Sequence, residues 1–327
     1  MLKKCLPLLL LCTAPVFAKP VLTVYTYDSF AANWGPGPVV KKAFEADCNC
    51  ELKLVALEDG VSLLKRLRME GKNSKADVVL GLDNNLLDAA SKTGLFAKSG
   101  VAADAVNVPG GWNNDTFVPF DYGYFAFVYD KNKLKNPPQS LKELVESDQN
   151  WRVIYQDPRT STPGLGLLLW MQKVYGDDAP QAWQKLAKKT VTVTKGWSEA
   201  YGLFLKGESD LVLSYTTSPA YHILEEKKDN YAAANFSEGH YLQVEVAART
   251  AASKQPERPL KFLPLMVSPA FQNAIPTGNW MYPVANVTLP AGFEQLTKPA
   301  TTLEFTPAEV AAQRQAWISE WQRAVSR

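Results

Sequence analysis

The feature that most constrains the fold is the regular alternation of strand-like and helix-like segments in the first ninety residues. Apolar runs rich in β-branched and aromatic residues, typical of buried strands, occupy 21–27, 52–57 and 76–82. Segments with helical spacing of apolar residues follow them, at 38–44, 61–69 and 86–92. A strand–helix order repeated in this way predicts a parallel sheet with helices on both faces.

A second unit of the same kind begins with an unusually aromatic strand. Residues 120–130, FDYGYFAFVYD, alternate Tyr and Phe with small residues, and we expect this strand to cross between two lobes. The segments expected next are strands at 151–155 and 211–215, helices at 141–146 and 163–174, a returning strand at 243–247 and an amphipathic helix at 307–325. We therefore predict an α/β protein of two lobes, each a mixed, mainly parallel sheet flanked by helices, joined by two crossing strands.

The predicted lobes are discontinuous in the chain. Residues 19–120 with about 248–327 form the first lobe, and about 121–247 form the second, with crossing strands near 121–130 and 241–247. Ligands of such sheets bind beyond the carboxyl ends of the strands, where helices begin. The arrangement suggests a hinged receptor for a small solute.

The first eighteen residues have the pattern of an export signal. Basic MLKK precedes an apolar run that is too short to span a bilayer, and Ala18 ends a peptidase pattern, so we expect a mature N-terminus at Lys19. A lipid-anchored alternative would use Cys12, but Leu10 and Leu11 stand where that signal needs small residues. The predicted location of the mature protein is the periplasm.

The charge of the mature chain argues against polyanionic partners. Lys and Arg total 35 and Asp and Glu total 33, and the excess of two lies in Lys3 and Lys4 of the export signal. A neutral protein without a basic cluster is a poor nucleic-acid binder.

The cysteines and histidines offer little for metal binding or catalysis. Cys48 and Cys50 form either a tight local disulfide or two free thiols, and neither state provides a metal site. His222 and His240 lack ligand spacing, so each is expected at the surface or in a hydrogen bond. No catalytic residue, metal or cofactor is predicted.

Several segments together resemble the periplasmic thiamine-binding proteins of ABC importers. These segments are VLTVYTYDSF…WGPGP, LVALEDG, QDPRTSTPGLG, KGWSEAY, SYTTSPAY and IPTGNWMYPV, and the similarity extends through essentially the whole mature chain. The resemblance implies a type II periplasmic solute-binding fold like that of thiaminase I. It also implies a monomeric receptor that captures thiamine, thiamine monophosphate or thiamine diphosphate between its lobes, does no chemistry on them, and delivers them to a membrane permease.

The resemblance also implies which residues contact the ligand. The matching ligand-contacting positions are Asp59, Gly60, Ser161, Thr162, Trp197, Tyr215, Thr216, Thr217 and Ser218, and the matching aromatic positions are Tyr27, Trp34, Tyr221 and Trp280. Aromatic rings suit a flat aminopyrimidine and a cationic thiazolium, with about 0.5–2 kcal/mol for each good cation–π contact.

Some of these residues have an equally simple structural interpretation. Trp34, Trp197 and Trp280 are either core residues or cleft walls, and the neighbouring Gly and Pro favour loops. Asp59 before Gly60 is an ordinary helix N-cap as well as a candidate ligand contact.

The segment Ser161-Thr162-Pro163-Gly164 is open to two interpretations. Thr162 is expected to cap the following helix, whose free N–H groups would suit a phosphate. Arg159 either adds positive charge there or points to solvent. The hydroxyls of Thr216 to Ser218 are expected to repeat this arrangement after a second strand.

Two other functions remain possible from the residues. An iron(III) receptor would use paired tyrosinates, whereas Tyr215 and Tyr221 are six residues apart. An exported thiamine-degrading enzyme would need a nucleophile and a base near the cleft. Separately, Pro259 can open a helix of the first lobe, whereas Pro264 should kink it and so affect the local packing of that lobe.

Overall fold

The structure is a computed structural model that describes residues 17–327. Residues 1–16, which include Cys12 and most of the expected export signal (residues 1–18), therefore lie outside the described residues. The strands form one continuous path in the order β2-β1-β3-β10-β5-β8-β6-β7.

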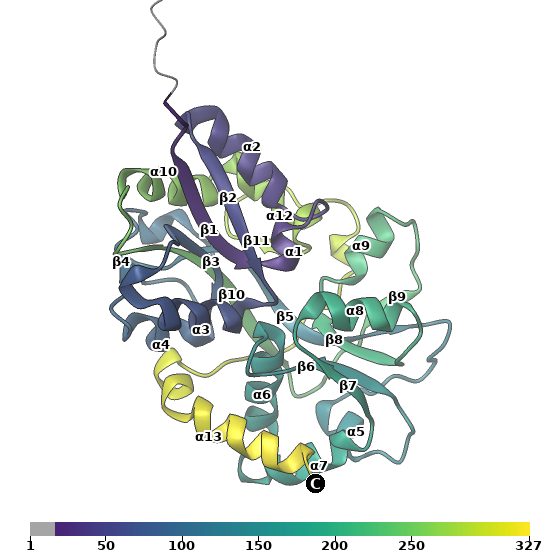
Figure 1. Cartoon of the computed structure of the whole chain (residues 1–327). Helices are drawn as coiled ribbons and strands as arrows, with labels where there is room; N and C mark the ends of the chain where they lie inside the picture. The colour runs from purple at the N-terminus through teal and green to yellow at the C-terminus, as the bar shows by residue number, and fades with distance from the viewer. Residues whose placement is uncertain (1–16) are drawn as a thin grey trace, which may run out of the picture.

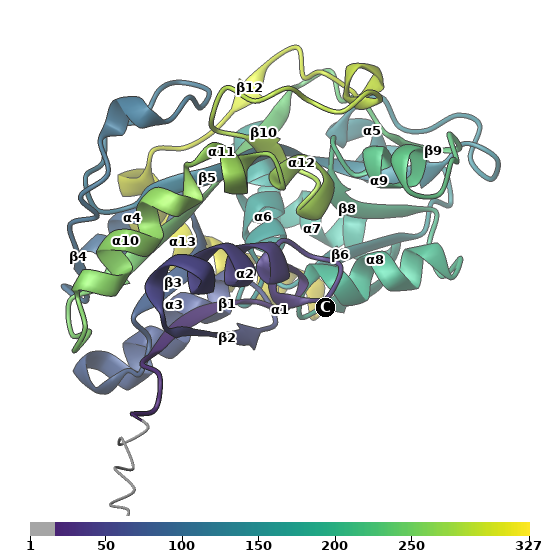
Figure 2. The ribbon, with the colours of Figure 1, turned by 90° about the horizontal axis from the view of Figure 1, so that it is seen from above.

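The first sheet confirms the parallel arrangement predicted from the alternating pattern. Strand β1 (Val21–Tyr27) pairs in parallel with β2 (Glu51–Leu57) and β3 (Val78–Asp83), and β10 (His240–Thr250) pairs antiparallel with β3. Helices α2 (Gly37–Cys48) and α10 (Glu257–Met266) pack together on one face (Figure 2). Helices α3 (Gly60–Glu70) and α4 (Leu87–Ser91) cover the other.

The alternation of side chains along β1 explains why both faces are covered. Leu22 and Val24 are fully buried against α2 and α10, whereas Tyr25 packs into the cluster that includes Leu63 and Leu67 of α3. A strand that is apolar on both faces is stable only between two layers of helices.

Strand β5 (Val118–Asp130) is shared by both halves of the molecule (Figure 1). Its first part pairs antiparallel with β10, up to Tyr124 opposite Leu242. Its second part pairs antiparallel with β8 (Leu211–Tyr215), from Phe125 opposite Tyr215 onward. The predicted crossing strand is therefore confirmed, and the cavity described below lies beside this passage.

The second sheet has the same plan as the first. Strands β8, β6 (Val153–Gln156) and β7 (Thr190–Thr194) are parallel to one another. The helices of this half are α5 (Leu141–Glu146), α6 (Thr162–Tyr175), α7 (Ala179–Ala187) and α8 (Trp197–Leu205). The remaining short elements are α1 (Asp28–Ala31), α9 (Pro219–Leu224), α11 (Pro269–Gln272), α12 (Ile275–Gly278), β4 (Phe96–Ala97), β9 (Tyr231–Ala233), β11 (Tyr282–Pro283) and β12 (Thr302–Leu303).

The C-terminal helix α13 (Pro307–Val325) agrees with the predicted amphipathic segment. Thr306 and Glu309 form a reciprocal capping box at its start. Val310 and Trp321 are buried, and the helix packs against α7 and α4 (Figure 1). It therefore contacts helices from both halves, and the expected lobe boundaries near 120 and 247 stay a prediction.

The structure answers one local question left by the sequence, the state of the cysteines, and gives the bounds of the helix that contains Pro264. Cys48 and Cys50 are joined by a disulfide at the end of α2, so the two-thiol alternative is wrong for this structure. Helix α10 extends from Glu257 to Met266 with Pro264 inside it.

Candidate functional site

A cavity of about 360 Å³ lies where the two halves of the molecule meet. Its walls come from the ends of β1 and β8, the start of α3, helices α8 and α9, strand β10 and the loop after α12. The lining residues are Tyr27, Ser29, Trp34, Asp59, Trp197, Ser198, Tyr201, Gly202, Leu205, Tyr215, Ser218, Tyr221, Glu245, Asn279, Trp280 and Met281. This volume suits a small organic molecule.

Aromatic side chains form most of the apolar wall. Trp197 stacks on Tyr201 with ring centroids 5.0 Å apart, and Trp34 lies 6.5 Å from Trp197. Tyr221 meets Trp280 edge to face at 5.4 Å. Trp34 and Tyr221 are 56% and 37% exposed, which places them where the cavity opens to solvent. Ring faces arranged in this way suit a flat or cationic ligand.

The backbone around Trp197 fixes its ring as a wall. Gly196 precedes α8, and a Cβ there would lie 2.6 Å from the carbonyl oxygen of Glu58, so only glycine permits this approach. The indole N–H donates to Ser214 Oγ at 2.8 Å, and Ser214 Oγ is 2.6 Å from Ser218 Oγ. The indole is therefore oriented by hydrogen bonding as well as stacking.

Trp280 occupies a backbone conformation that side-chain-bearing residues seldom adopt. Its φ is +55°, in the left-handed region. A non-glycine residue held there costs on the order of 1–3 kcal/mol, and such strain gathers at functional sites. The conformation turns the ring of Trp280 toward Tyr221 at the cavity wall.

Asp59 joins the two halves of the molecule through its carboxylate. It is the N-cap of α3, with Oδ1 accepting from Gly60 N–H at 2.8 Å. Oδ2 accepts from the Ser161 hydroxyl at 2.8 Å, at the start of α6, and from the backbone N–H of Trp197 at 3.2 Å, at the start of α8. Burial raises the pKa of Asp59 to about 7. The same carboxylate therefore caps α3 and lines the cavity, and its contact with a ligand stays a prediction.

A second carboxylate, Glu245 of β10, also lines the cavity. Glu245 Oε2 accepts from Tyr27 Oη and from Asn279 Nδ2, each at 3.2 Å. Asn279 Nδ2 also donates to Asp121, which lies directly opposite Glu245 in the sheet. Burial, with the neighbouring Asp121, raises the pKa of Glu245 well above its usual range, and burial raises the pKa of Asp121 to about 6.

The cavity contains many but not all of the residues predicted from the sequence. Those that line it are Tyr27, Trp34, Asp59, Trp197, Tyr215, Ser218, Tyr221 and Trp280. Those that do not are Gly60, Ser161, Thr162, Thr216 and Thr217, all of which are buried.

The start of α6 differs from the expectation in two ways. Ser161, not Thr162, is the N-cap, because its hydroxyl oxygen accepts from Gly164 N–H at 3.2 Å. Thr162 is the first residue of the helix, and its Oγ1 is buried with no hydrogen-bond partner in the described part of the chain. The Ser161 hydroxyl faces Asp59, so the anion at this helix start is a side chain of the protein itself.

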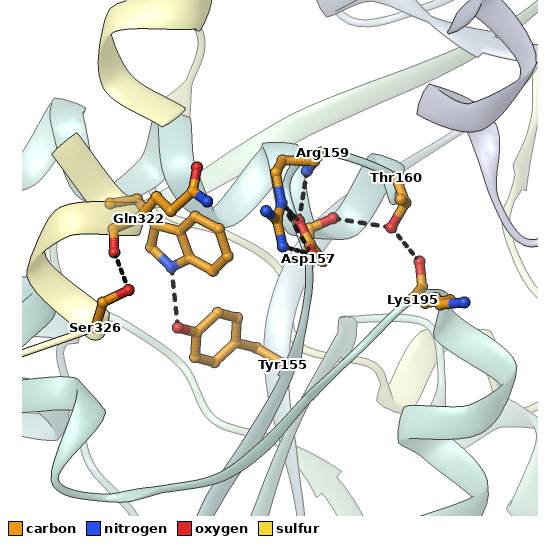
Figure 3. Close-up of polar contacts among 8 residues, drawn as sticks. Tyr155, Asp157, Arg159, Thr160, Lys195, Gln322 and Ser326 are labelled. Carbon is orange, nitrogen blue, oxygen red and sulfur yellow. Dashed lines mark hydrogen bonds and ion pairs between the residues drawn. The ribbon is translucent and has the colours of Figure 1, made fainter. Parts of the chain in front are cut away.

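Arg159 contributes no charge to the cavity. Its guanidinium binds Asp157 at 2.7 Å and lies 5.5 Å from the ring of Trp321 in α13 (Figure 3). Neither Arg159 nor Asp157 lines the cavity. Of the two alternatives for Arg159, the exposed position is the one found, with its charge paired to Asp157.

The segment after β8 does not form the second hydroxyl-rich helix start that the sequence predicted at Thr216 to Ser218. The N-cap Ser218 makes no capping hydrogen bond through its side chain, and α9 is only six residues long. The Thr216 and Thr217 side chains are fully buried. Ser218 is the hydroxyl of this group that reaches the cavity.

Eight lining residues were not predicted: Ser29, Ser198, Tyr201, Gly202, Leu205, Glu245, Asn279 and Met281. Glu245 carried a usable signal, since it is an acid between Val244 and Val246 in a strand buried on both faces. Tyr201 and Leu205 carried another, because they follow Trp197 at helical spacing.

The lining also bears on the alternative functions. It contains no cysteine or histidine, and both cysteines of the described chain are in the disulfide. No group of three or more His, Cys, Asp or Glu that could hold a metal ion occurs among residues 17–327. Tyr215, one of the two tyrosines considered for an iron(III) site, is partly buried, and its hydroxyl donates a hydrogen bond to Gln243 at 2.8 Å.

Comparison with known proteins identifies the family. The model of the bacterial extracellular solute-binding proteins matches residues 36–273. The chain belongs to this family. It is 98% identical over all 327 residues to the thiamine-binding periplasmic protein of Escherichia coli strain K12, with both chains fully covered.

Solved structures agree with this assignment. A periplasmic thiamin binding protein matches with a TM-score of 0.93 and 97% identity, over 94% of this chain and 97% of that one. Iron-bound HitA from Pseudomonas aeruginosa matches with a TM-score of 0.75 at 21% identity, over 93% and 99% of the two chains, which shows the fold alone. The predicted family, fold class and periplasmic location are confirmed. No helix within residues 17–327 is long and apolar enough to cross a membrane.

Proposed function

We propose that this protein is a periplasmic receptor that captures thiamine in the cavity between its two halves and delivers it to an ABC importer. The observation that supports it most directly is the composition of the cavity. Aromatic walls around Trp197 and Trp280 stand beside two buried carboxylates, Asp59 and Glu245, and no Lys or Arg lines the space. Such a cavity suits a flat cation. The near-identity to a protein named for thiamine binding supports the same ligand.

The protein is proposed to bind its ligand without transforming it. A nucleophilic mechanism would need an activated Cys, Ser or similar group beside a base. The lining offers the hydroxyls of Ser29, Ser198 and Ser218, but no histidine to activate them. Incubation with thiamine followed by mass spectrometry tests this directly: one intact ligand per protein is expected, whereas pyrimidine or thiazole fragments would identify an enzyme.

Thiamine monophosphate and diphosphate are proposed as further ligands. A phosphate that approaches the start of α6 meets the Asp59 carboxylate, which already accepts from Ser161 and Trp197. Two anions repel each other in a buried site, so the phosphate of these ligands is proposed to lie away from this helix start. Native mass spectrometry of protein purified from cells identifies the retained ligand by its mass.

Delivery requires a membrane partner, which we propose to be the permease of the importer. Vesicles that contain the purified transporter should accumulate labelled thiamine only when the receptor is added. Accumulation at the same rate without the receptor would contradict the proposed delivery step while leaving ligand capture intact.

A further inference from the structure

Three acidic residues form a row across neighbouring strands, and the middle one, Glu245, lines the cavity. Asp83 of β3 lies opposite Glu245 of β10, and Glu245 lies opposite Asp121 of β5. All three are at least nine-tenths buried. Like charges directly opposite one another destabilise a sheet, so this row is costly for folding alone.

The groups that face Glu245 supply hydrogen bonds but no positive charge. Tyr27 of β1 and Asn279 donate to Oε2, whereas Asp121, Asp83 and, farther off, Asp59 add negative charge. Tyr215 is a further neutral neighbour, bonded to Gln243 of the same strand. Arg314 acts on Asp83 from α13, and no cation is among the groups that act on Glu245 itself.

One oxygen of Glu245 remains available to a ligand. Both donors described above bind Oε2, and the one further hydrogen bond that reaches Glu245 from the described residues is the proton shared with Asp121. Glu245 lines the cavity although it is only 6% exposed. A nearly buried carboxylate with a free oxygen at a cavity wall needs a donor or a cation to offset its burial.

We propose that Glu245 accepts the positively charged or N–H-bearing part of the ligand, and that this contact releases the proton that Asp121 and Glu245 share. This inference rests on the proposed function, in which the ligand is a cation. Before binding, the adjacent carboxylates share a proton because both cannot ionise together in a buried site. A bound cation supplies the missing positive charge, and the proton leaves to solvent.

The raised pKa values of Glu245 and Asp121 support the direction of this exchange. Where one proton is released per ligand, affinity rises up to tenfold per pH unit. Binding should therefore tighten from pH 5.5 to pH 8. Asp59, whose pKa is also raised, is the other cavity acid that titrates in this range.

The test is calorimetric titration with thiamine at pH 5.5, 6.5 and 8, in two buffers that differ in ionisation enthalpy. The difference between buffers gives the number of protons released, and the titration of thiamine itself is the same for every variant. The wild-type protein is expected to release protons on binding. Asp59→Asn, the matched control in the same cavity, should retain the release that arises from Glu245.

Two substitutions of opposite effect separate recognition from a structural role. Glu245→Gln keeps the shape of the side chain but cannot ionise. It should therefore lower the affinity for thiamine at least tenfold at pH 8 and have little effect at pH 5.5. It should also abolish the proton release that arises from Glu245. Asp121→Asn leaves Glu245 without its competing carboxylate, so affinity at pH 5.5 should rise and proton release should fall. Thermal unfolding of both variants checks that they are folded.

The outcomes distinguish this inference from the proposed function. Equal losses of affinity at every pH in both variants would assign Glu245 a structural role and overturn the inference. Tight thiamine binding by the wild-type protein with no proton release would overturn it too, while leaving the receptor function intact. Absence of thiamine binding by the wild-type protein would instead refute the proposed function itself.

Discussion

Replacing Asp59 by asparagine should weaken ligand binding by a pH-dependent amount. Its Oδ2 accepts two hydrogen bonds, from Ser161 and Trp197, while Oδ1 accepts from Gly60. Asparagine has one carbonyl oxygen and one NH₂ group in place of the two carboxylate oxygens. Its NH₂ group must therefore face the backbone N–H of either Gly60 or Trp197, and two donors cannot form a hydrogen bond with each other. Asparagine also has no charge to offer a cationic ligand; a hydrogen bond between the ligand and a charged group is worth about 1.5–3 kcal/mol, which corresponds to roughly a ten- to hundredfold loss of affinity.

The pH dependence provides the sharpest part of this test. Burial raises the pKa of Asp59 to about 7, so the wild-type carboxyl is mainly ionised at pH 8 and mainly neutral at pH 5.5. The difference between wild-type and Asp59→Asn affinities, measured by calorimetry, should therefore be large at pH 8 and small at pH 5.5. Asp59→Ala is the companion variant, since it also removes the cap of α3, worth about 0.5–2 kcal/mol of stability. If affinity is unchanged at pH 8 while Asp59→Ala lowers only the melting temperature, Asp59 is a helix cap and nothing more.

The remaining predictions concern the walls, the helix start, the motion and the buried acids. Trp197→Ala should weaken binding of thiamine and both phosphates about equally, because the rings are common to all three ligands; a loss confined to one ligand in calorimetry would contradict this. Ser161→Ala with Thr162→Ala should also affect the three ligands about equally, since Ser161 reaches the cavity only through Asp59 and Thr162 does not line it; a loss restricted to the phosphates would restore the anion site expected from the sequence. Small-angle scattering should show a smaller radius of gyration with thiamine than without, by closure about the crossing strands, and an unchanged radius at saturation would indicate a cavity that is closed beforehand. Burial raises the pKa of Asp83 from 3.8 to about 7, so the folded state binds this proton more tightly and its contribution to the free energy of unfolding falls as pH rises from about 4 to 7. Asp83→Asn should accordingly raise the melting temperature at pH 8 and leave it nearly unchanged at pH 4; equal shifts at both values would exclude titration as the cause.

The fold could be predicted from the sequence because its signals are local. The apolar run at 21–27 and the helix that follows it specify a buried strand and its cover without knowledge of distant residues. The capping box at Thr306 is equally local. Partners that are distant in the chain could not be predicted in this way, such as the pairing of β3 with β10.

The site was less predictable because its chemistry depends on contacts between distant segments. The sequence shows a helix start at Ser161 but not that Asp59, about 100 residues earlier, supplies its anion. Glu245 is an isolated acid in an apolar strand until the sheet places it between Asp83 and Asp121. The aromatic residues were easier to predict, since glycine and proline beside Trp34 and Trp280 place those rings in loops.

The pairing of β3 with β10 has a consequence for biogenesis. About 150 residues separate Asp83 from His240, and β10 is the strand that covers this edge of β3. At a synthesis rate of roughly 5–20 residues per second, the edge stays uncovered for about 10–30 s on the ribosome, and for as long as translocation delays the second segment. An apolar strand with an open edge is a template for association with other chains. A holding chaperone or rapid translocation would therefore protect the nascent protein until β10, which ends at Thr250 of 327 residues, has emerged.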